Sequence, residues 1–277
     1  MSKQNLSVMM SAIFVMGLVA GQAMAQVSFS ENFEGLSAGG LDGQNGWSAD
    51  GEIELNSTGG GHMTGFGPSM GARNSNGNPG TFTATHSLGT TISGGSIIAT
   101  ALVSPSCGSC QKGGSILVSD GGSNSLAVQV LGRSPDSTIS LIGPGGTRTT
   151  TAPFTGGVFV NGSSGSGIVD FNDALFVEVK IEYNLDTGVA TGSVRDVLDY
   201  DGRPTTYGAL SITDTFDSFT PFDVTTVGFT TTTASNSVNF SGHVDDVTFE
   251  AIPEPASLTL LALGGLMMFW RRQPRSR

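Results

Sequence analysis

The strongest constraint on the fold is a long alternation of apolar and polar residues in the second half of the chain. In residues 174–184 apolar residues occupy every second position, and Glu178, Lys180 and Glu182 occupy positions between them. A period of two places the two sets on opposite faces of an extended strand. The segment therefore predicts a β-strand with one buried face and one solvated face.

Other short apolar runs follow the same pattern, separated by turns rich in Gly, Asn, Asp and Pro. The chain contains 41 glycines, and no stretch between the two ends keeps a helical period for three turns. Residues 186–188, Asp-Thr-Gly, predict a hairpin turn after the long strand. The predicted strands are 27–33, 81–88, 96–103, 115–119, 125–131, 138–142, 174–184, 189–196, 209–213, 223–232 and 237–250. The fold class is therefore predicted to be all-β.

The N-terminus has the features of a secretory signal peptide. Lys3 gives a positive start, residues 8–20 are mostly apolar, and Ala23-Met24-Ala25 is a small-x-small cleavage pattern. We expect a signal helix over residues 1–25 and a mature chain that begins at Gln26.

The C-terminus combines a Pro-Glu-Pro element with an uncharged span and a basic tip. Pro253, Glu254 and Pro255 precede residues 256–270, which carry no charge, and Arg271 and Arg272 open an arginine-rich end. As a helix the span reaches about 22 Å, which is short against a hydrocarbon core of about 30 Å. We expect a short transmembrane helix whose basic end remains in the cytoplasm.

This arrangement resembles the PEP-CTERM sorting signal of Gram-negative bacteria that produce exopolysaccharide. The resemblance implies recognition and removal by a membrane exosortase, and delivery of the body from the inner membrane to the outer surface or extracellular matrix. An ordinary anchor that is never processed is the alternative. The predicted division is a signal peptide at 1–25, a β-sandwich domain at 26–251 and a sorting signal at 252–277.

The body between the two end segments is strongly acidic. Lys3 and four tail arginines lie outside it, as does Glu254, which leaves seven of 12 basic and 22 of 23 acidic residues and a net charge of −15. Such a charge argues against nucleic acid and anionic lipid as partners, because both favour clusters of Lys and Arg.

The strand order also carries a weaker resemblance, over residues 27–250. An opening Ser-Glu-Asn-Phe-Glu-Gly, the long strand with its Asp-Thr-Gly turn and a closing Val-Asp-Asp-Val-Thr-Phe-Glu resemble concanavalin A-like and laminin G-like jelly rolls. The resemblance implies an antiparallel two-sheet β-sandwich whose first and last strands are adjacent at one edge. Glucan hydrolases of this fold carry a Glu-x-Asp-x-Glu strand. Here Lys180 replaces the central Asp between Glu178 and Glu182, and we expect it to pair with both glutamates, so no catalytic residue is predicted.

The remaining candidate residues are few. Cys107 and Cys110 are predicted to form a local disulfide, because neither a redox nor a zinc context surrounds them. No cofactor is predicted, and calcium is the one ion considered, because laminin G-like domains often bind it at a loop rim. The candidate calcium ligands are Asp199, Asp201, Asp245 and Asp246, and the candidate glycan contacts are Tyr200, Tyr207 and Trp47. Tyr200 and Tyr207 are expected in an exposed loop, and Trp47 is more often a core residue at such a position.

Three functions remain open at this point. The first is a non-enzymatic envelope or matrix protein that binds glycan or has a structural role within exopolysaccharide. The second is a divergent glycoside hydrolase or polysaccharide lyase, and the third is an adhesin or scaffold that contacts protein. Fold resemblance does not decide among them, because one fold supports many functions.

Overall fold

The computed structural model describes most of the body of the chain. The described residues are 26–51, 53–56, 71–74, 80–104, 112–132, 137–144, 146–152, 177–200, 204–216, 220–233 and 243–252. All of them except Gln26 belong to one compact unit, Val27–Ile252. The predicted terminal helices lie outside the described residues. Within the described part, no helix has the length and apolar character needed to cross a membrane.

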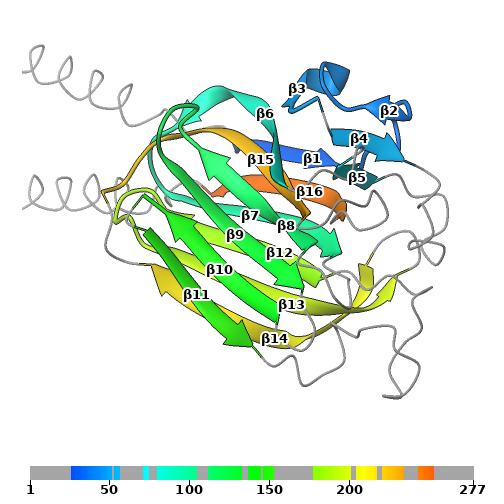
Figure 1. Ribbon diagram of the computed structural model, residues 1–277. Helices are drawn as coiled ribbons and strands as arrows, with labels where there is room; N and C mark the ends of the chain where they lie inside the picture. The colour runs from blue at the N-terminus through cyan, green and yellow to red at the C-terminus, as the bar shows by residue number, and fades with distance from the viewer. Residues whose placement is uncertain are drawn as a thin grey trace, which may run out of the picture. The chain divides into compact units, whose positions relative to one another are not determined.

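The body is a sandwich of two antiparallel sheets (Figure 1). The nine-stranded sheet has the order β14 (Pro204–Phe216), β13 (Ala190–Tyr200), β12 (Val177–Asn184), β7 (Ser96–Ser104), β16 (His243–Ile252), β5 (Gly71–Asn74), β4 (Ile53–Asn56) and β2 (Gly39–Gly40), and β1 (Ser28–Glu31) pairs with β16. The seven-stranded sheet has the order β11 (Gly146–Ala152), β10 (Ser137–Gly143), β9 (Ser125–Gly132), β8 (Lys112–Ser119), β15 (Val224–Thr233), β6 (Gly80–Ile92) and β3 (Trp47–Ala49). A short 3-10 turn, η1 (Gln44–Gly46), precedes β3. The predicted all-β sandwich is confirmed.

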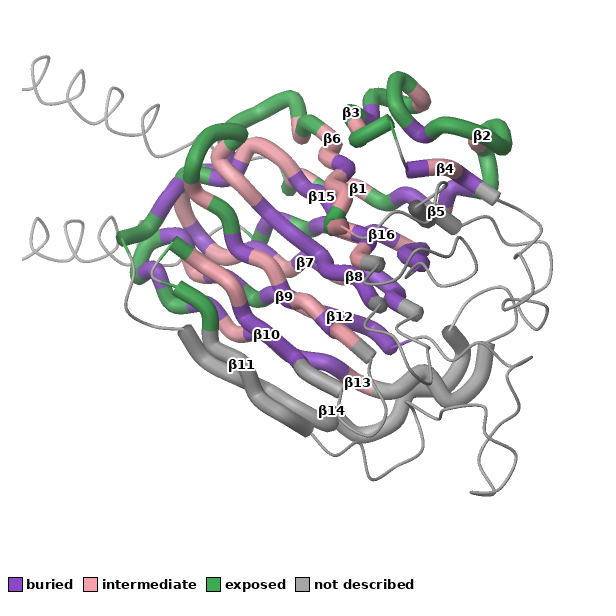
Figure 2. The backbone as a smooth tube through the Cα atoms, viewed as in Figure 1, coloured by how far each residue is buried: buried purple, intermediate pink, exposed green. Residues whose placement is uncertain are grey.

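The core fills the space between the sheets with alternate residues from their strands. On β12, Val177, Val179, Ile181 and Tyr183 are each at most 1% exposed, as their period of two predicts. Figure 2 shows buried positions along the strands of both sheets and exposed positions mainly at loops and ends. Aligned sheets are held together in this way by interdigitating inner side chains.

An aromatic cluster closes the part of the sandwich near the N-terminus. The Trp47 ring lies 5.7 Å from the Phe33 ring and 5.2 Å from the Phe229 ring, measured between centroids. The buried carboxylate of Glu31 accepts hydrogen bonds from Phe33 N at 2.8 Å and Asn45 Nδ2 at 2.7 Å. These two bonds satisfy a charge that would otherwise be costly to bury, and they connect β1 to the turn before β3.

Tyr183 joins the two sheets at one end of the sandwich. Its hydroxyl donates to Phe222 O at 3.1 Å and accepts from Phe222 N at 2.8 Å, and the two rings lie 5.2 Å apart. Burial raises the pKa of the Tyr183 hydroxyl, and the charge of Asp223 raises it further, although the Phe222 N–H acts in the opposite direction. The contact positions the segment that enters β15, which lies between β8 and β6 in the seven-stranded sheet.

The first and last strands are adjacent at one edge of the nine-stranded sheet, as predicted. Among the described residues β1 pairs only with β16, and β16 pairs with β7 on its other side, while β5 follows β1 along the same side of β16. A register shift between Asp245 and Thr248 and a positive φ of 45° at Asp246 mark a bulge in β16. Both chain ends of the body therefore lie side by side, with Ala251 N donating to Val27 O at 2.8 Å.

Most predicted strands are found within a few residues of their expected bounds, but several observed strands were missed. The Thr-rich β11 and the short β2, β3 and β4 were not predicted. The loop expected over residues 200–207 is wrong, because β13 continues to Tyr200 and β14 begins at Pro204. The sequence in this region alternates only weakly between apolar and polar residues, so its local strand signal is weak. The strands form because β13 and β14 pair with each other in a long, irregular ladder.

Candidate functional site

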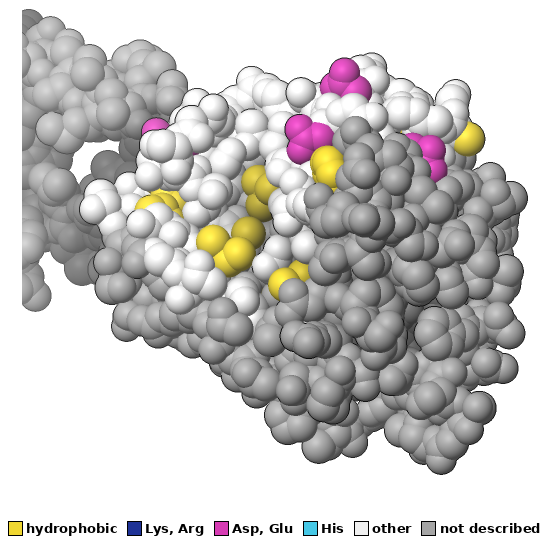
Figure 3. All heavy atoms as spheres, viewed as in Figure 1, with side chains coloured by type: hydrophobic (Ala, Val, Ile, Leu, Met, Phe, Trp, Pro, Cys, Tyr) yellow, Lys and Arg dark blue, Asp and Glu magenta, His cyan; other side chains and the backbone are white. Residues whose placement is uncertain are grey.

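The outer surface of the seven-stranded sheet carries no charged side chain among its described residues. Residues such as Ala84, Ile116, Val128 and Phe229 point into the core, so the residues between them point outward. The outward residues are Ser48, Thr81, Thr83, Thr85, Ser87, Ser115, Leu117, Ser119, Ser125, Ala127, Gln129, Leu131, Ser140, Ile142, Thr147, Thr226, Thr230 and Thr232. We call this surface the hydroxyl face. Figure 3 shows it as a mostly white area with scattered yellow side chains, and the magenta acidic side chains lie toward its margins.

The strand register arranges the hydroxyl face in rows that cross the strands. Across β8, β9 and β10 an apolar row of Leu117, Ala127 and Ile142 has Ser115, Gln129 and Ser140 on one side and Ser119 and Ser125 on the other. Neighbouring rows are two residues apart along each strand, or about 7 Å. On these strands one apolar row therefore lies between two hydrogen-bonding rows at a spacing that the backbone fixes, although Leu117, Ser115 and Ser140 are themselves buried.

Hydrogen bonds between strands hold several of these hydroxyl groups in place. Ser119 Oγ lies 2.6 Å from Thr226 Oγ1, Ser115 Oγ 2.8 Å from Thr230 Oγ1, and Thr81 Oγ1 3.1 Å from Thr232 Oγ1. Thr226 Oγ1 also donates to Ser119 O at 3.4 Å, and Thr232 Oγ1 also accepts from Gln129 Nε2 at 3.5 Å. A hydroxyl has one donor and two acceptor positions, so even two bonds leave one position for another partner. Thr226, Thr230 and Thr232 are each partly exposed and can use that capacity.

The turn between β8 and β9 fixes one end of the hydroxyl face. Asp120 Oδ1 accepts from Gly122 N at 2.7 Å, and Oδ2 accepts from Asn124 Nδ2 at 2.7 Å. The bond from Gly122 N lowers the pKa of the Asp120 carboxyl most, and the bond from Asn124 lowers it further. The charged carboxylate therefore stabilises the turn that keeps Ser119 and Ser125 opposite each other.

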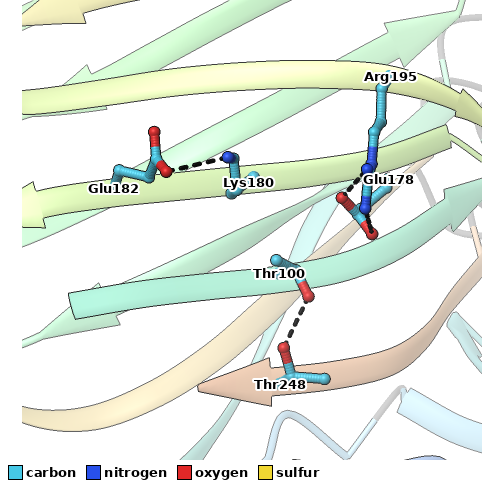
Figure 4. A network of polar contacts seen from close by, with 6 residues as sticks. All are labelled: Thr100, Glu178, Lys180, Glu182, Arg195 and Thr248. Atoms are coloured by element: carbon cyan, nitrogen blue, oxygen red, sulfur yellow. Dashed lines mark hydrogen bonds and ion pairs between the residues drawn. The ribbon is translucent and has the colours of Figure 1, made fainter. Parts of the chain in front are cut away.

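The outer surface of the nine-stranded sheet is different, because it carries charged side chains (Figure 4). Arg195 Nε lies 2.6 Å from Glu178 Oε1, and Arg195 Nη2 lies 2.9 Å from Glu178 Oε2, which is a bidentate ion pair. Lys180 Nζ pairs with Glu182 Oε1 at 3.0 Å. The expectation that Lys180 pairs with both glutamates is wrong, because Arg195 on the neighbouring strand lies directly opposite Glu178.

This geometry gives Glu178 and Glu182 fixed electrostatic partners. Both oxygens of Glu178 accept bonds from one guanidinium, and Glu178 is 7% exposed. A glycosidase needs one carboxyl to donate a proton and another to attack or to activate water. In this arrangement neither oxygen of Glu178 is free for that chemistry.

The structure moves one candidate glycan contact into the core and two others into strands. Trp47 is 2% exposed within the aromatic cluster, so its assignment as a glycan contact is wrong: a buried indole cannot stack on a sugar ring. Tyr200 ends β13 and Tyr207 lies in β14, in one irregular ladder. Their roles as glycan contacts stay predictions.

The candidate calcium ligands that the structure describes are not all brought together. Asp199 lies on β13 and Asp245 on β16, with β12 and β7 between them, a separation of about 14 Å across the sheet. Asp245 is 1% exposed, Asp246 lies at the bulge, and Asp201 lies outside the described residues. Among the residues that the structure describes, no group of three or more His, Cys, Asp and Glu side chains could hold a metal ion.

Two further sets of predicted residues fall outside the description. Cys107 and Cys110 are one set, and the sorting residues Pro253, Glu254, Pro255, Arg271 and Arg272 are the other. Sequence reasoning missed the hydroxyl face entirely. The available signal was the Thr-x-Thr alternation at Thr81, Thr83 and Thr85 and again in β15, which contains no charged residue.

Comparison with protein families identifies the C-terminal segment. The profile of the PEP-CTERM protein-sorting motif matches residues 251–273. This motif implies export, membrane-associated sorting and, in general, exosortase processing. No protein of curated function shows significant sequence similarity to the chain.

Comparison with solved structures finds lectins of the same sandwich class. The basic winged bean lectin with Tn-antigen is 12% identical, with a TM-score of 0.44, over 83% of this chain and 100% of that chain. Lectin II from Ulex europaeus is 14% identical, with a TM-score of 0.43, over 81% of this chain and 97% of that chain. At these identities and TM-scores, the sugars that such lectins bind carry no argument about this chain.

Proposed function

We propose that this protein is a non-enzymatic component of the cell envelope that binds neutral polysaccharide through the hydroxyl face. The observation that carries the proposal is the uncharged outer surface of the seven-stranded sheet, on a body whose net charge is −15. The sorting motif supplies the location. After passing through the inner membrane, the body reaches the outer surface or matrix, where exopolysaccharide is the partner.

The chemistry of the hydroxyl face is complementary to sugar rings without charge. A pyranose presents C–H groups on its faces and hydroxyls at its edges. Ala127 and Ile142, the partly exposed members of the apolar row, suit the C–H groups, and the accessible side chains of Ser119, Ser125 and Gln129 offer donors and acceptors. A hydrogen-bonded sheet also loses little conformational freedom on binding.

Charge determines which polysaccharides are excluded. Anionic polymers such as alginate are repelled by the acidic body, and the hydroxyl face has no described Lys or Arg that would compensate for the repulsion. Neutral glucans, mannans and galactans meet no such barrier. The proposed ligand class is therefore neutral.

The absence of a catalytic role rests on the position and bonding of carboxylates. The described residues of the hydroxyl face include no Asp or Glu, and on the opposite sheet Arg195 holds Glu178 while Lys180 holds Glu182. A divergent hydrolase or lyase is the competing function. A screen of the mature protein for turnover of β-glucans, agars and alginates tests it directly.

The binding test compares two similar substitutions on opposite sheets. Thr85 on the hydroxyl face and Thr191 on the nine-stranded sheet are both partly exposed and both point outward. We expect Thr85→Lys to weaken retention of the body on neutral polysaccharide about tenfold, by crowding the apolar row and adding a charge. Thr191→Lys, next to Glu182, should leave retention unchanged.

Retention is measured by affinity electrophoresis against neutral and acidic polysaccharides. Equal behaviour of the two variants, or preferred binding of acidic polymers, would refute the proposed face. Turnover that disappears in Glu178→Gln or Glu182→Gln would establish the enzyme instead. Self-association of the body without retention on any polysaccharide would favour a scaffold.

A further inference from the structure

The sorting motif begins inside a hydrogen-bonded strand. Its match starts at residue 251, and Ala251 and Ile252 are the last two residues of β16. Pro253 is the next residue in the sequence. The sequence therefore provides no linker between the folded sheet and the Pro-Glu-Pro element.

The end of β16 is paired on both sides. Toward β7, Glu250 lies opposite Ile98, Ala251 opposite Ile97 and Ile252 opposite Ser96. Toward β1, Glu250 lies opposite Ser28, and Ala251 N donates to Val27 O at 2.8 Å. Ala251 is also 6% exposed, with its methyl group in the core. The backbone of this segment is thus already engaged by two neighbouring strands.

A peptide-cleaving enzyme needs that same backbone. Extended peptides are commonly bound by main-chain hydrogen bonds to an added strand, and only an unpaired segment can make them. From Ile252 to the end of Pro255 the chain spans about 10 Å when extended. Several residues before any bond cut in this region therefore lie within β16.

We propose that residues 250–252 must separate from β1 and β7 before the sorting signal can be cleaved, so that opening of this strand end limits the processing rate. The inference rests on the proposed sorting and adds a requirement that comes from the body itself. The docked end of β16 protects the signal from cleavage, and β1, the first strand of the mature chain, is part of that protection.

The test is a pulse-chase measurement of the full chain in a host with a compatible exosortase, with the loss of residues 256–277 followed by mass. Eight Gly and Ser residues inserted between Ile252 and Pro253 supply the missing linker. We expect this variant to be processed about tenfold faster, because strand ends open only part of the time.

A second variant locks the strand end. Ser28 and Glu250 are exposed and directly opposite, next to the hydrogen-bonded Val27 and Ala251, so Ser28→Cys with Glu250→Cys can form a cross-strand disulfide. Oxidation of this pair should slow processing about tenfold or more, and reduction should restore the rate. Glu182→Cys with Thr191→Cys, opposite each other in β12 and β13, is the matched lock at another site, and it should have no effect on processing.

The outcomes separate this inference from the function on which it rests. If the wild-type chain is processed and the oxidised Ser28–Glu250 lock is processed at the same rate, the inference is refuted and sorting stands. If the linker variant is processed at the same rate as the wild-type chain, the inference is likewise refuted and sorting stands. If only the linker variant is cut, the inference is supported in its strongest form. If neither the wild-type chain nor the linker variant is ever cut, both the inference and the proposed processing are refuted.

Discussion

Replacing Tyr183 with phenylalanine should destabilise the sandwich, although the side chain loses only its hydroxyl oxygen. The hydroxyl makes two hydrogen bonds to the backbone of Phe222, which is 8% exposed, and Tyr183 itself is 1% exposed. The ring contact with Phe222 at 5.2 Å is kept in the variant. The change therefore isolates the two hydrogen bonds.

The expected cost follows from the burial of the groups involved. A buried polar group that loses its partner costs about 1–3 kcal/mol, and two groups of Phe222 lose this partner, so we expect a total of about 2–4 kcal/mol. For a domain of this size the melting temperature should fall by roughly 10 °C. Urea unfolding of the body, with an unchanged dependence on denaturant, measures the free energy directly.

The control variant is Phe222→Leu, which keeps both backbone groups and the tyrosine but removes the ring contact. We expect it to cost about 1 kcal/mol. If Tyr183→Phe costs less than about 0.5 kcal/mol, the hydroxyl does not join the sheets and the reasoning is wrong.

The direction of the pKa shift adds a test with a definite sign. The pKa of Tyr183 is raised in the folded state, so its contribution to stability is complete below the usual tyrosine pKa near 10 and is lost as the pH rises through the folded value. The wild-type body should lose stability above pH 10 more steeply than Tyr183→Phe. An identical alkaline profile for the two proteins would contradict this assignment.

Three other substitutions test other parts of the fold. Arg195→Ala should lower the free energy of unfolding in urea by about 2–4 kcal/mol, because it removes both hydrogen bonds to the buried Glu178. The double variant Glu178→Met with Arg195→Met should recover most of the lost stability, because no buried charge is left without a partner. If the single and double variants are equally destabilised, the ion pair does not have this role. Gly192→Ala should cost about 1–3 kcal/mol, since a Cβ there would lie 2.7 Å from Val128 Cγ2 of the opposite sheet; a neutral effect would mean that the sheets separate easily at this point. Asp120→Asn should make the stability of the body less sensitive to acid. The lowered pKa of Asp120 contributes stability that is present above the usual Asp pKa and is lost as the pH falls through the pKa of the folded state. Identical acid unfolding curves for the wild type and the variant would contradict this.

The sequence by itself determined the elements whose signal is local. The alternation in residues 174–184 predicted β12 and its buried face because side chains of a strand alternate regardless of neighbours. The end segments were also readable, and the Pro-Glu-Pro tail is the segment that the sorting profile matches. Such signals depend on residues within one short stretch of chain.

Only the tertiary structure decided which residues meet across strands. The hydroxyl face collects side chains from positions 48 to 232, and its rows exist because pairing places Ala127 beside Leu117 and Ile142. Likewise, Arg195 reaches Glu178 and Tyr183 reaches Phe222 through strand register and sheet packing, while Trp47 is buried by aromatic neighbours from other elements. Local propensity contains no information about such distant partners, because register is fixed by the whole set of inward-facing residues at once.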